Sequence, residues 1–502
     1  MDIFSKNTEL LNRAWICWHG FGGFRKERNR CKRYCYGDQW GDPLFVDGRW
    51  MREENYIRSQ GSEPLKNNLI RRLVKQVIGL YRSEDHQLSV DCSDKAVSKL
   101  LAGALDDVRR RNLLDELDAR ALEEFLISGM VVQRKTYGWR NGREGCWTYN
   151  VRPDNFFIDS FSSDCRGWDV SCLGEIHDMT FGELCAEFGK NDNDVKALAE
   201  IYNPERFSRL SAGGYAGGSY AFSGADAFLQ PSNLSLCRVY EVWHRVRTQG
   251  YLCHDRDAGR LYWLDACIPP SSGCDLQWGI SDEWCYSFLS PFGDVLAEGT
   301  TPYWHCQHPY SFKAYPFLDG EIHSFVGDVI DQQRYTNRLI TLYDWVMRSS
   351  AKGVLIVPEE SVPDGYTVDD MAEQWARFNG VIPVKTRNGS AMPHQVAANA
   401  ANVGINELLQ TQLDFMEDIS GVTGALQGKS SSSGMSGKLY EQQTHNASLS
   451  QLDMLNTFRS FVCDGAYKDV CNILQFRLDA ASGCSDDMIA DRENLIKTIK
   501  IF

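Results

Sequence analysis

The sequence lacks any run of about eighteen apolar residues, so no membrane-spanning helix is predicted. It also lacks a basic surplus, because 53 Lys and Arg stand against 67 Asp and Glu, giving a formal net charge of -14. Proteins that hold nucleic acid tightly are usually basic, since phosphate neutralisation supplies most of that affinity. We therefore expect a surface that can meet DNA without retaining it. The start, MDIFSKNTELLNRAW, has no basic segment followed by an apolar one, so no secretory signal peptide is expected.

Signatures of common catalytic and metal sites are missing as well. The chain has no Cys-x-x-Cys pair, no His-Glu-x-x-His helix and no Gly-x-Ser-x-Gly elbow. The richest clusters of possible metal ligands are HCQH at 305–308 and the Cys253-His254 pair. Because neither has the spacing of a zinc site, we expect these side chains in the core or on the surface. No catalytic residue, cofactor or metal ion is predicted.

The segment GALQGKSSSSG, which contains Gly428, is similar to a phosphate-binding loop only in part. That loop requires a Gly five positions before its Gly-Lys-Ser, and here Thr423 occupies the position. It also follows a strand, whereas a helical pattern precedes this segment. GFGGF near Gly20 interrupts a helical pattern too, which disfavours a dinucleotide-binding loop. We interpret the first segment as an exposed Ser/Gly loop.

Cysteine is abundant, but its pattern does not indicate a disulfide framework. There are 17 Cys residues, an odd number at irregular spacing. A long chain with no predicted signal peptide is expected to keep its thiols reduced. We therefore expect most of them as small buried hydrophobic side chains.

The first 210 residues predict helices followed by strands. The first 130 are expected to be mainly helical, with Leu69, Leu73, Val77 and Leu80 on one face of a helix. MVVQRKTYGWRNGREGCWTYNV then predicts a hairpin that turns at Asn141-Gly142, and Thr180 a helix cap.

The middle of the chain predicts a Gly-rich linker and then a β-rich stretch. SAGGYAGGSYAFSG, 211–224, is the linker candidate. The β-rich stretch follows to about residue 310, with a hairpin turn at Ser290–Asp294. We expect a small β module inserted into a helical protein.

A long helix is predicted to begin at Phe325. If it reaches Ser350 it spans about 26 residues, or roughly 39 Å. Its apolar stripe is expected to comprise Phe325, Val329, Thr336, Leu339, Leu342, Tyr343 and Val346. Two interpretations remain open: a solvated helix with internal ion pairs, Asp331 with Arg334 and Asp344 with Arg348, or a helix packed against copies of itself.

Beyond the long helix, GVLIVP and GVIPVKT predict two strands, and INELLQTQLDFMEDISG a helix that ends at Gly421. A loop and a long helical tail complete the chain.

Five segments in this order resemble the portal protein of tailed double-stranded DNA bacteriophages. They are NNLIRRLVKQVIGLYRS, VRPDNFFIDS, LSPFGDVLAEGTTPYWHCQHPYSF, IDQQRYTNRLITLYDWVMRSSAKGVLIVP and ISGVTGALQGKSSSSGMSGKLYEQQ. Together they extend from about residue 65 to 460, and the region 211–280 departs most from the family pattern. The resemblance implies a non-enzymatic subunit of a ring, usually of about twelve copies, that surrounds a DNA channel.

The resemblance also implies an α+β fold, mainly α-helical, with regions named as in a portal. These would be an N-terminal wing region (1–210), a Gly-rich linker (211–234), a β-rich clip region (235–318), a stem helix (319–353), wing strands (354–403), a helix with a candidate tunnel loop (404–437, the loop at 426–437), and a helical C-terminal crown (438–502). In this arrangement the stem helix lines the channel, and the clip docks the packaging motor and then the head–tail adaptors.

Functional residues are expected mainly on the stem helix. Candidates for weak contacts with passing DNA are Arg334, Arg338, Arg348, Lys352, Lys429 and Ser431. Candidates for packing between subunits are Phe325, Val329, Leu339, Leu342 and Val346.

The implied partners are other copies of the chain, double-stranded DNA, major capsid and scaffold proteins, the terminase large subunit and head–tail adaptors, with no membrane. The implied location is the portal vertex of the virion, after assembly in the host bacterial cytoplasm. Two rival functions stay open: an enzyme acting on nucleic acid or polysaccharide, and another ring or adaptor protein of the virion.

Overall fold

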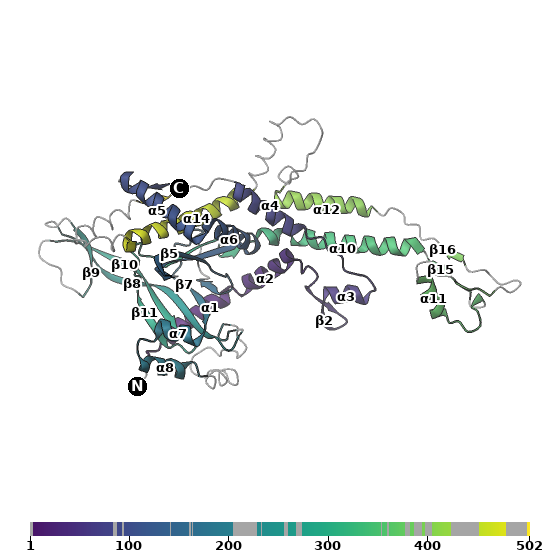
Figure 1. The fold of residues 1–502 in the computed structure, drawn as a ribbon, viewed down its shortest axis with the longest axis horizontal. Coiled ribbons are helices and arrows are strands. Elements are labelled where there is room, and N and C mark those ends of the chain that lie inside the picture. Colours follow the sequence, from purple (N-terminus) through teal and green to yellow (C-terminus); the bar gives the residue numbers. More distant parts are fainter. Residues whose placement is uncertain are drawn as a thin grey trace, which may run out of the picture. The chain divides into compact units, whose positions relative to one another are not determined.

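The structure is a computed structural model, and it describes most of the chain. The residues outside the description are 1–3, 84–87, 93–94, 141, 160–161, 163, 204–227, 232, 256–259, 268–273, 353, 359–360, 377–381, 386–393, 397–403, 423–450, 478–498 and 502. The chain divides into two compact units. The first unit comprises Met1–Lys32, Val74–Gly327 and Gly434–Phe502, and the second Arg33–Leu73 and Asp328–Ser433. Helices α2 (Gly22–Tyr36), α4 (Leu69–Ser83) and α10 (Phe325–Lys352) cross the division (Figure 1).

The first unit contains a six-stranded antiparallel sheet. Its strands are β6 (Phe156–Ile158), β7 (Cys172–Met179), β8 (Cys237–Asp255), β9 (Arg260–Asp265), β10 (Cys274–Leu289) and β11 (Val295–Thr300). The order is β11-β10-β8-β7-β6, and β9 pairs with the outer part of β8. The turn between β10 and β11 is the predicted one, where the Ser290 amide donates to the Asp294 carbonyl at 2.8 Å. Local turn chemistry therefore determined this hairpin.

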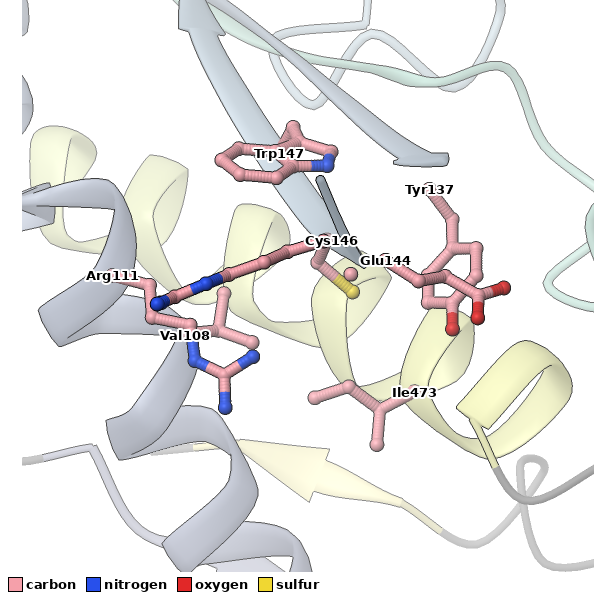
Figure 2. A pocket seen from close by; sticks show the side chains of 9 residues that line it. Val108, Arg111, Tyr137, Glu144, Cys146, Trp147 and Ile473 are labelled. Atoms are coloured by element: carbon pink, nitrogen blue, oxygen red, sulfur yellow. The ribbon is translucent and has the colours of Figure 1, made fainter. Parts of the chain in front are cut away.

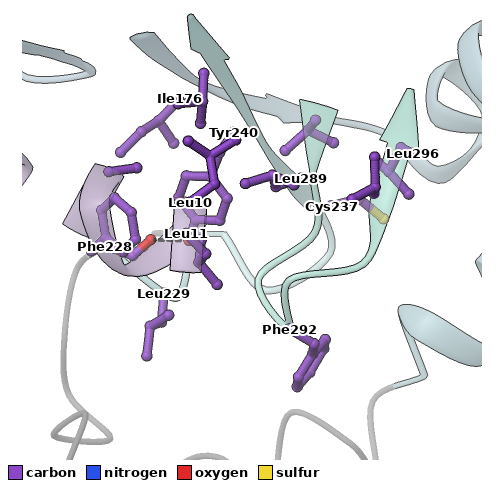
Figure 3. Packing of buried hydrophobic residues seen from close by; sticks show 14 of the residues in the cluster. Leu10, Leu11, Ile176, Phe228, Leu229, Cys237, Tyr240, Leu289, Phe292 and Leu296 are labelled. Atoms are coloured by element: carbon purple, nitrogen blue, oxygen red, sulfur yellow. Dashed lines mark hydrogen bonds between the residues drawn. The ribbon is translucent and has the colours of Figure 1, made fainter. Parts of the chain in front are cut away.

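Each face of this sheet contributes to a separate hydrophobic core. Successive side chains of a strand point to opposite faces, so Phe157 enters one core while Phe156 and Ile158 enter the other. The first core is covered by α1 (Thr8–Gly20), α7 (Phe181–Phe188) and α8 (Asp192–Ile201), with Leu10 and Leu11 of α1 inside it (Figure 3). Thr180 caps α7 with a full capping box, as its sequence predicted.

The second core lies against a three-stranded sheet of β12 (Tyr310–Ala314), β4 (Met130–Arg140) and β5 (Arg143–Asn150). Strands β4 and β5 form the hairpin predicted around Gly142. Helices α5 (Lys95–Asn112), α6 (Leu114–Ser128) and α14 (Leu452–Asn472), with a π-helical turn at Ile473–Arg477, complete this part. Two short pairs, β3 (Val90–Asp91) with β17 (Lys500–Ile501) and β13 (Pro316–Leu318) with β14 (Glu321–Ile322), also belong to the unit.

The second unit is built on most of α10 and on α12 (Ile405–Ser420). Between these helices the chain forms a small lobe of β15 (Val354–Ile356), α11 (Val368–Ala376) and β16 (His394–Val396), in which β15 pairs with β16 (Figure 1). The N-terminal part of the unit adds the hairpin β1 (Pro43–Val46) and β2 (Arg49–Arg52), followed by α3 (Glu53–Ser59). Helix α12 ends at Gly421, as predicted, in a left-handed conformation that suits Gly.

The expectation of an inserted β module was wrong. Strands β8 and β10 continue a sheet that begins with β6 and β7, so one sheet includes strands from both sides of residue 235. The pattern could not reveal this, because alternation marks a strand but not its partner. Most of the expected linker, 211–234, lies outside the described residues. Phe228 within it belongs to the core, since its side chain is fully buried and stacks on Tyr240 at 4.5 Å.

Two other local expectations need correction. The hairpin β1–β2 lies in the stretch expected to be helical, and its turn places Asp47 and Gly48 at φ 51° and 77°. A two-residue turn with both φ values positive favours an Asp-Gly pair. The sequence contains that pair at Asp47-Gly48, and it indicates a hairpin where mainly helix was expected. In GVIPVKT, the described residues Ile382–Lys385 form no strand, and His394–Val396 pairs with β15 instead. The helical tail is described from Leu452 onward.

Candidate functional site

Helix α10 is the candidate functional element. Polar side chains on one of its faces bind it to the rest of the second unit. Gln333, Asn337 and Thr341 recur every four residues, so they share one face of the helix. All three are buried. The Gln333 Oε1 accepts from the backbone amides of Leu69 at 2.9 Å and Ile70 at 3.2 Å. These amides begin α4 and have no partner inside that helix, so the Gln333 side chain caps it.

The same face of α10 binds the extended segment before α4. The Asn337 Oδ1 accepts from the Asn67 amide at 3.1 Å, and the Thr341 hydroxyl accepts from the Leu65 amide at 3.2 Å. The Asn337 Nδ2 donates to Gln39 at 2.7 Å. Leu65 is half-buried, and an amide that is shielded from water and left unpaired costs about 1–3 kcal/mol. Gln333, Asn337 and Thr341 thus help to hold part of α10 inside the subunit. Their four-residue spacing within an apolar pattern is the sequence signal that could have indicated this.

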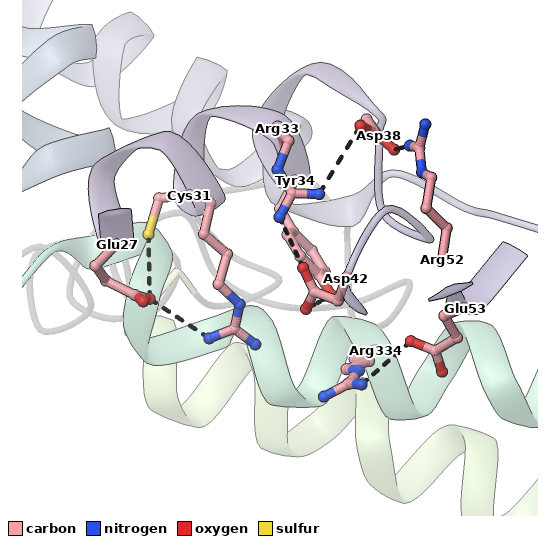
Figure 4. A network of polar contacts seen from close by, with 10 residues as sticks. Glu27, Cys31, Arg33, Tyr34, Asp38, Asp42, Arg52, Glu53 and Arg334 are labelled. Carbon is pink, nitrogen blue, oxygen red and sulfur yellow. Dashed lines mark hydrogen bonds and ion pairs between the residues drawn. The ribbon is translucent and has the colours of Figure 1, made fainter. Parts of the chain in front are cut away.

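Two of the predicted DNA-contact residues, Arg334 and Arg338, form ion pairs with Glu53 of the same chain. Arg334 contacts Glu53 at 3.1 Å (Figure 4). Arg338 binds the other oxygen of the same carboxylate. The Glu53 side chain is 4% exposed, whereas Arg338 is 47% exposed. Glu53 also opens α3, where a negative charge is favoured by the helix dipole. The partner of Arg334 is therefore Glu53, and not Asp331, which one of the two open interpretations had paired with it.

A second set of charges fixes the β1–β2 hairpin beside α3. Asp42 accepts from Arg33 at 2.8 Å and from the Tyr34 hydroxyl at 2.8 Å, and Arg52 donates to Asp38 at 2.8 Å (Figure 4). Because the Asp42 carboxylate is nearly buried, both donors are needed to satisfy it. The Glu53 amide also donates to the Asp42 carbonyl at 3.0 Å, so these contacts position Glu53 beside Arg334 and Arg338.

The predicted packing residues divide into two groups. Phe325, Val329 and Leu339 are buried within the subunit, at 5%, 0% and 5% exposure. They are therefore not available to another copy. Leu342 is 46% exposed, and Val346 is half-buried. Of the five predicted packing residues, only Leu342 and Val346, in the outer half of α10 (342–352), are accessible to a partner.

That outer half is unusually apolar for an exposed helix. Within six residues it exposes Leu342, Tyr343, Trp345 and Met347, each by 40% or more. Helix α12 of the same unit exposes Leu408, Phe415 and Ile419, which recur at helical spacing on one side. Apolar side chains clustered in this way mark a surface that another molecule covers.

The other four predicted DNA-contact residues fall partly or wholly outside the described part of the chain. Lys429 and Ser431 lie outside the described residues, as does the candidate loop 426–437. The side chains of Arg348 and Lys352 are also outside the description, although their backbone belongs to α10. These four residues stay a prediction.

The histidine cluster noted in the sequence is part of the core. His305 stacks on Tyr303 with ring centroids 5.0 Å apart, and His308 is perpendicular to Trp284 at 4.9 Å. Burial and the nearby Lys468 charge lower the pKa of His305 to about 3. Of the other pair, Cys253 is buried and His254 exposed. Most of the described cysteines are buried.

A cavity in the first unit is lined by both charged and aromatic side chains. Its volume is about 370 Å³, and α5, β4, β5 and the turn after α14 contribute to its wall (Figure 2). Its lining includes Arg111, Arg143 and Trp147. Arg111 already forms an ion pair with Asp107 at 2.7 Å, and the Trp147 indole donates to the Gly138 carbonyl. Arg111 and Trp147 therefore serve the local fold.

Comparison with known proteins agrees with the sequence resemblance. A family model described as phage P22-like portal protein matches residues 17–468, most of the chain. No curated protein matches the sequence. Among the described residues no helix is both long and apolar enough to cross a bilayer.

Proposed function

The chain belongs to the phage P22-like portal protein family, and from that premise we propose that its copies close into a ring around a DNA channel at one capsid vertex. The family match over residues 17–468 carries the proposal. The known role of the family is a ring-shaped channel for DNA packaging, and the family is structural rather than enzymatic.

The surfaces of the second unit support ring formation. A cyclic ring requires two different patches on each subunit that fit one another, so that contacts close without free ends. The outer half of α10 and one side of α12 are exposed apolar surfaces on the same unit. We infer that α10 and α12 together form the wall that copies build around the channel. Arg348 and Lys352 would then lie near the end of that wall.

The charge pattern supports a channel that lets DNA slide. Duplex DNA carries one charge per about 1.7 Å, so a lumen dense in free cations would retain it. The chain has a net charge of -14, and Glu53 neutralises part of the Arg334 and Arg338 charge. Contacts with passing phosphates would therefore be weak and repeated around the ring.

The docking site for the packaging motor is proposed at a different part of the chain from the one expected. Residues 235–318 were expected to dock it, but the inner parts of β8 and β10 are built into the cores of the first unit. We propose instead that the lobe between α10 and α12 docks the terminase large subunit. The lobe lies at the far end of α10 (Figure 1), and it exposes Tyr366 and Val368.

Two experiments test these proposals. Electron microscopy and native mass spectrometry of the purified protein should show a rotationally symmetric annulus with a central hole. A protein that is monomeric both in solution and in viral particles would overturn the ring. For docking, Val368→Asp should weaken terminase binding by rings, whereas Ile280→Asp on β10 should not. The opposite result would return the docking site to 235–318.

Activity assays on the same purified protein distinguish the proposed channel function from the rival enzymatic function. A portal subunit should hydrolyse no ATP and cleave neither DNA nor polysaccharide on its own, because the motor supplies the energy. The other proposed partners, capsid, scaffold and adaptor proteins, would meet the ring in the bacterial cytoplasm and remain with it in the virion.

A further inference from the structure

Three ligand-type side chains meet in the first unit, whereas the proposed channel wall belongs to the second unit. Glu175 and His177 are two residues apart on β7 and so share a face of the sheet. Glu241 on β8 lies directly opposite Glu175 in the strand register. Like charges directly opposite one another destabilise a sheet. Two ionised glutamates in this position would therefore be stabilised by a cation between or beside them.

The protein supplies part of that compensation, and its well-formed hydrogen bonds lie at Glu241. Its Oε2 lies 2.9 Å from the His177 Nε2 and 2.9 Å from Arg134, and its Oε1 accepts from the Trp243 indole at 2.8 Å. Although burial acts to raise the pKa of Glu241, the Arg134 charge and the bonds from His177 and Trp243 hold it at about 2. This carboxylate is ionised and rigidly oriented.

Glu175 is left without such partners. Its Oε2 is buried and has no hydrogen bond among the described residues, and the His177 Nε2 is 3.8 Å away. The fully buried Tyr310 hydroxyl lies near both carboxylates but forms no hydrogen bond of good geometry with either. Buried polar atoms without partners are rare, so these two indicate an absent ligand.

We propose that Glu175, His177 and Glu241 bind one divalent first-row transition metal ion. Their ligand atoms all lie within 4.8 Å of one another. Ligands of such an ion, bound at about 2.0–2.2 Å, lie roughly 3–3.5 Å apart. The separations of 2.9 and 3.8 Å from the His177 Nε2 to the two carboxylates bracket that range. One imidazole and two carboxylates suit Mn²⁺, Fe²⁺ or Zn²⁺ better than Ca²⁺, which prefers oxygen alone.

The surrounding residues match the outer shell of a metal site. Ligating carboxylates are usually hydrogen-bonded by neighbouring groups that orient them, as Arg134 and Trp243 orient Glu241. His177 and Glu175 are 20% and 14% exposed, so an ion could reach them from solvent. Bound there, the ion would join β7 to β8 and relieve the repulsion between the paired glutamates.

The test uses the full-length protein after treatment with chelator, and Mn²⁺ is the probe because thiolates favour Zn²⁺ and the chain has 17 Cys. Electron paramagnetic resonance should count one bound Mn²⁺ per chain, and Zn²⁺ should displace it. His177→Gln and Glu175→Gln should each weaken binding at least about tenfold. His254→Gln, which changes an exposed histidine on β8, is the control and should bind as the parent does.

Each result decides the proposal. Failure of the parent protein to bind one equivalent overturns it, and so does binding that His177→Gln and Glu175→Gln leave unchanged. If a variant does not fold, histidine coordination is read from the parent protein instead, by the nitrogen couplings of bound Mn²⁺ in pulsed spectra. Absence of those couplings also overturns the assignment.

Discussion

Lys135 of β4 and Asp469 of α14 form an ion pair of 2.8 Å in which the side chains are 3% and 0% exposed. The pair joins residues 334 positions apart. Thr148 also accepts from the Lys135 ammonium, at 3.0 Å, whereas the Asp469 Oδ1 has no partner among the described residues. Burial raises the pKa of Asp469 against the effect of Lys135. Such a pair fixes how α14 docks on the sheet more than it adds stability.

Removing one member of this pair should be costly. Asp469→Leu leaves the Lys135 ammonium buried and unpaired, and we expect a loss of about 3–5 kcal/mol in the free energy of unfolding. Lys135→Met with Asp469→Leu removes both charges and should recover most of that loss. Urea titrations of the two single variants, the double variant and the parent give the coupling energy. Additive losses would mean that the two side chains do not interact as described.

The two halves of α10 should respond differently to the same substitution. Leu339→Asp places a charge in the interior of the subunit, so we expect the subunit itself to lose about 4 kcal/mol or more of stability. Leu342→Asp changes a side chain that is 46% exposed, so the fold should survive while ring assembly fails.

Circular dichroism melts and native mass spectrometry measure the two effects separately. The control is Trp139→Asp, an equally drastic change of a 71% exposed side chain on β4, which should affect neither. Normal rings from Leu342→Asp would show that the outer half of α10 is not an interface between copies.

Features set by neighbouring residues could be predicted from the sequence. The Ser290–Asp294 turn, the Thr180 cap and the Gly421 end each depend on backbone chemistry within a few positions, and all three were predicted. The extent of α10 was also predicted, to within two residues at its end. The mixed α+β fold follows from such elements, and the family match agrees with it.

Features set by pairing across long sequence separations could not be predicted. Nothing near Arg334 indicates that its partner is Glu53, 281 positions earlier. The glutamates of the proposed metal site become neighbours only through the register of β7 and β8. The burial of Leu339 was missed for the same reason, because an apolar stripe shows which face is covered but not whether the cover is the same chain.

The Glu53 carboxylate should control how strongly the ring holds DNA. Glu53→Gln removes the charge that binds Arg334 and Arg338, and because both arginines are partly exposed we expect a stability loss of only about 1–2 kcal/mol. If α10 lines the channel, the freed cations should raise the affinity of rings for duplex DNA. They should also steepen its salt dependence, by up to about 0.9 in the logarithmic slope per phosphate neutralised.

Filter binding at several salt concentrations measures this effect. Adding Arg338→Ala to Glu53→Gln should return the slope toward that of the parent. Slopes that are equal in all three proteins would place these arginines away from the DNA path.

Lys468 gives the fold a dependence on alkaline pH. Its ammonium is buried on α14 and donates to the carbonyl oxygens of His308, at 3.0 Å, and Tyr310. Burial lowers its pKa to about 7, from an ordinary value of 10.5. Between these values the unfolded chain binds the proton and the folded chain does not, so stability should rise as the pH increases from about 7 toward 10.5. The group can contribute up to about 1.4 kcal/mol per pH unit in that window.

Lys468→Met should remove this contribution. Comparing the free energy of unfolding at pH 7 and pH 9, the parent should gain about 2 kcal/mol more than the variant, while below pH 7 the two proteins should change in parallel. Lys190→Met, at an exposed lysine after α7, is the matched control and should keep the slope of the parent. If Lys468→Met also kept that slope, the ammonium would have to remain protonated in the folded protein, and the docking of α14 would then include a buried positive charge at every physiological pH.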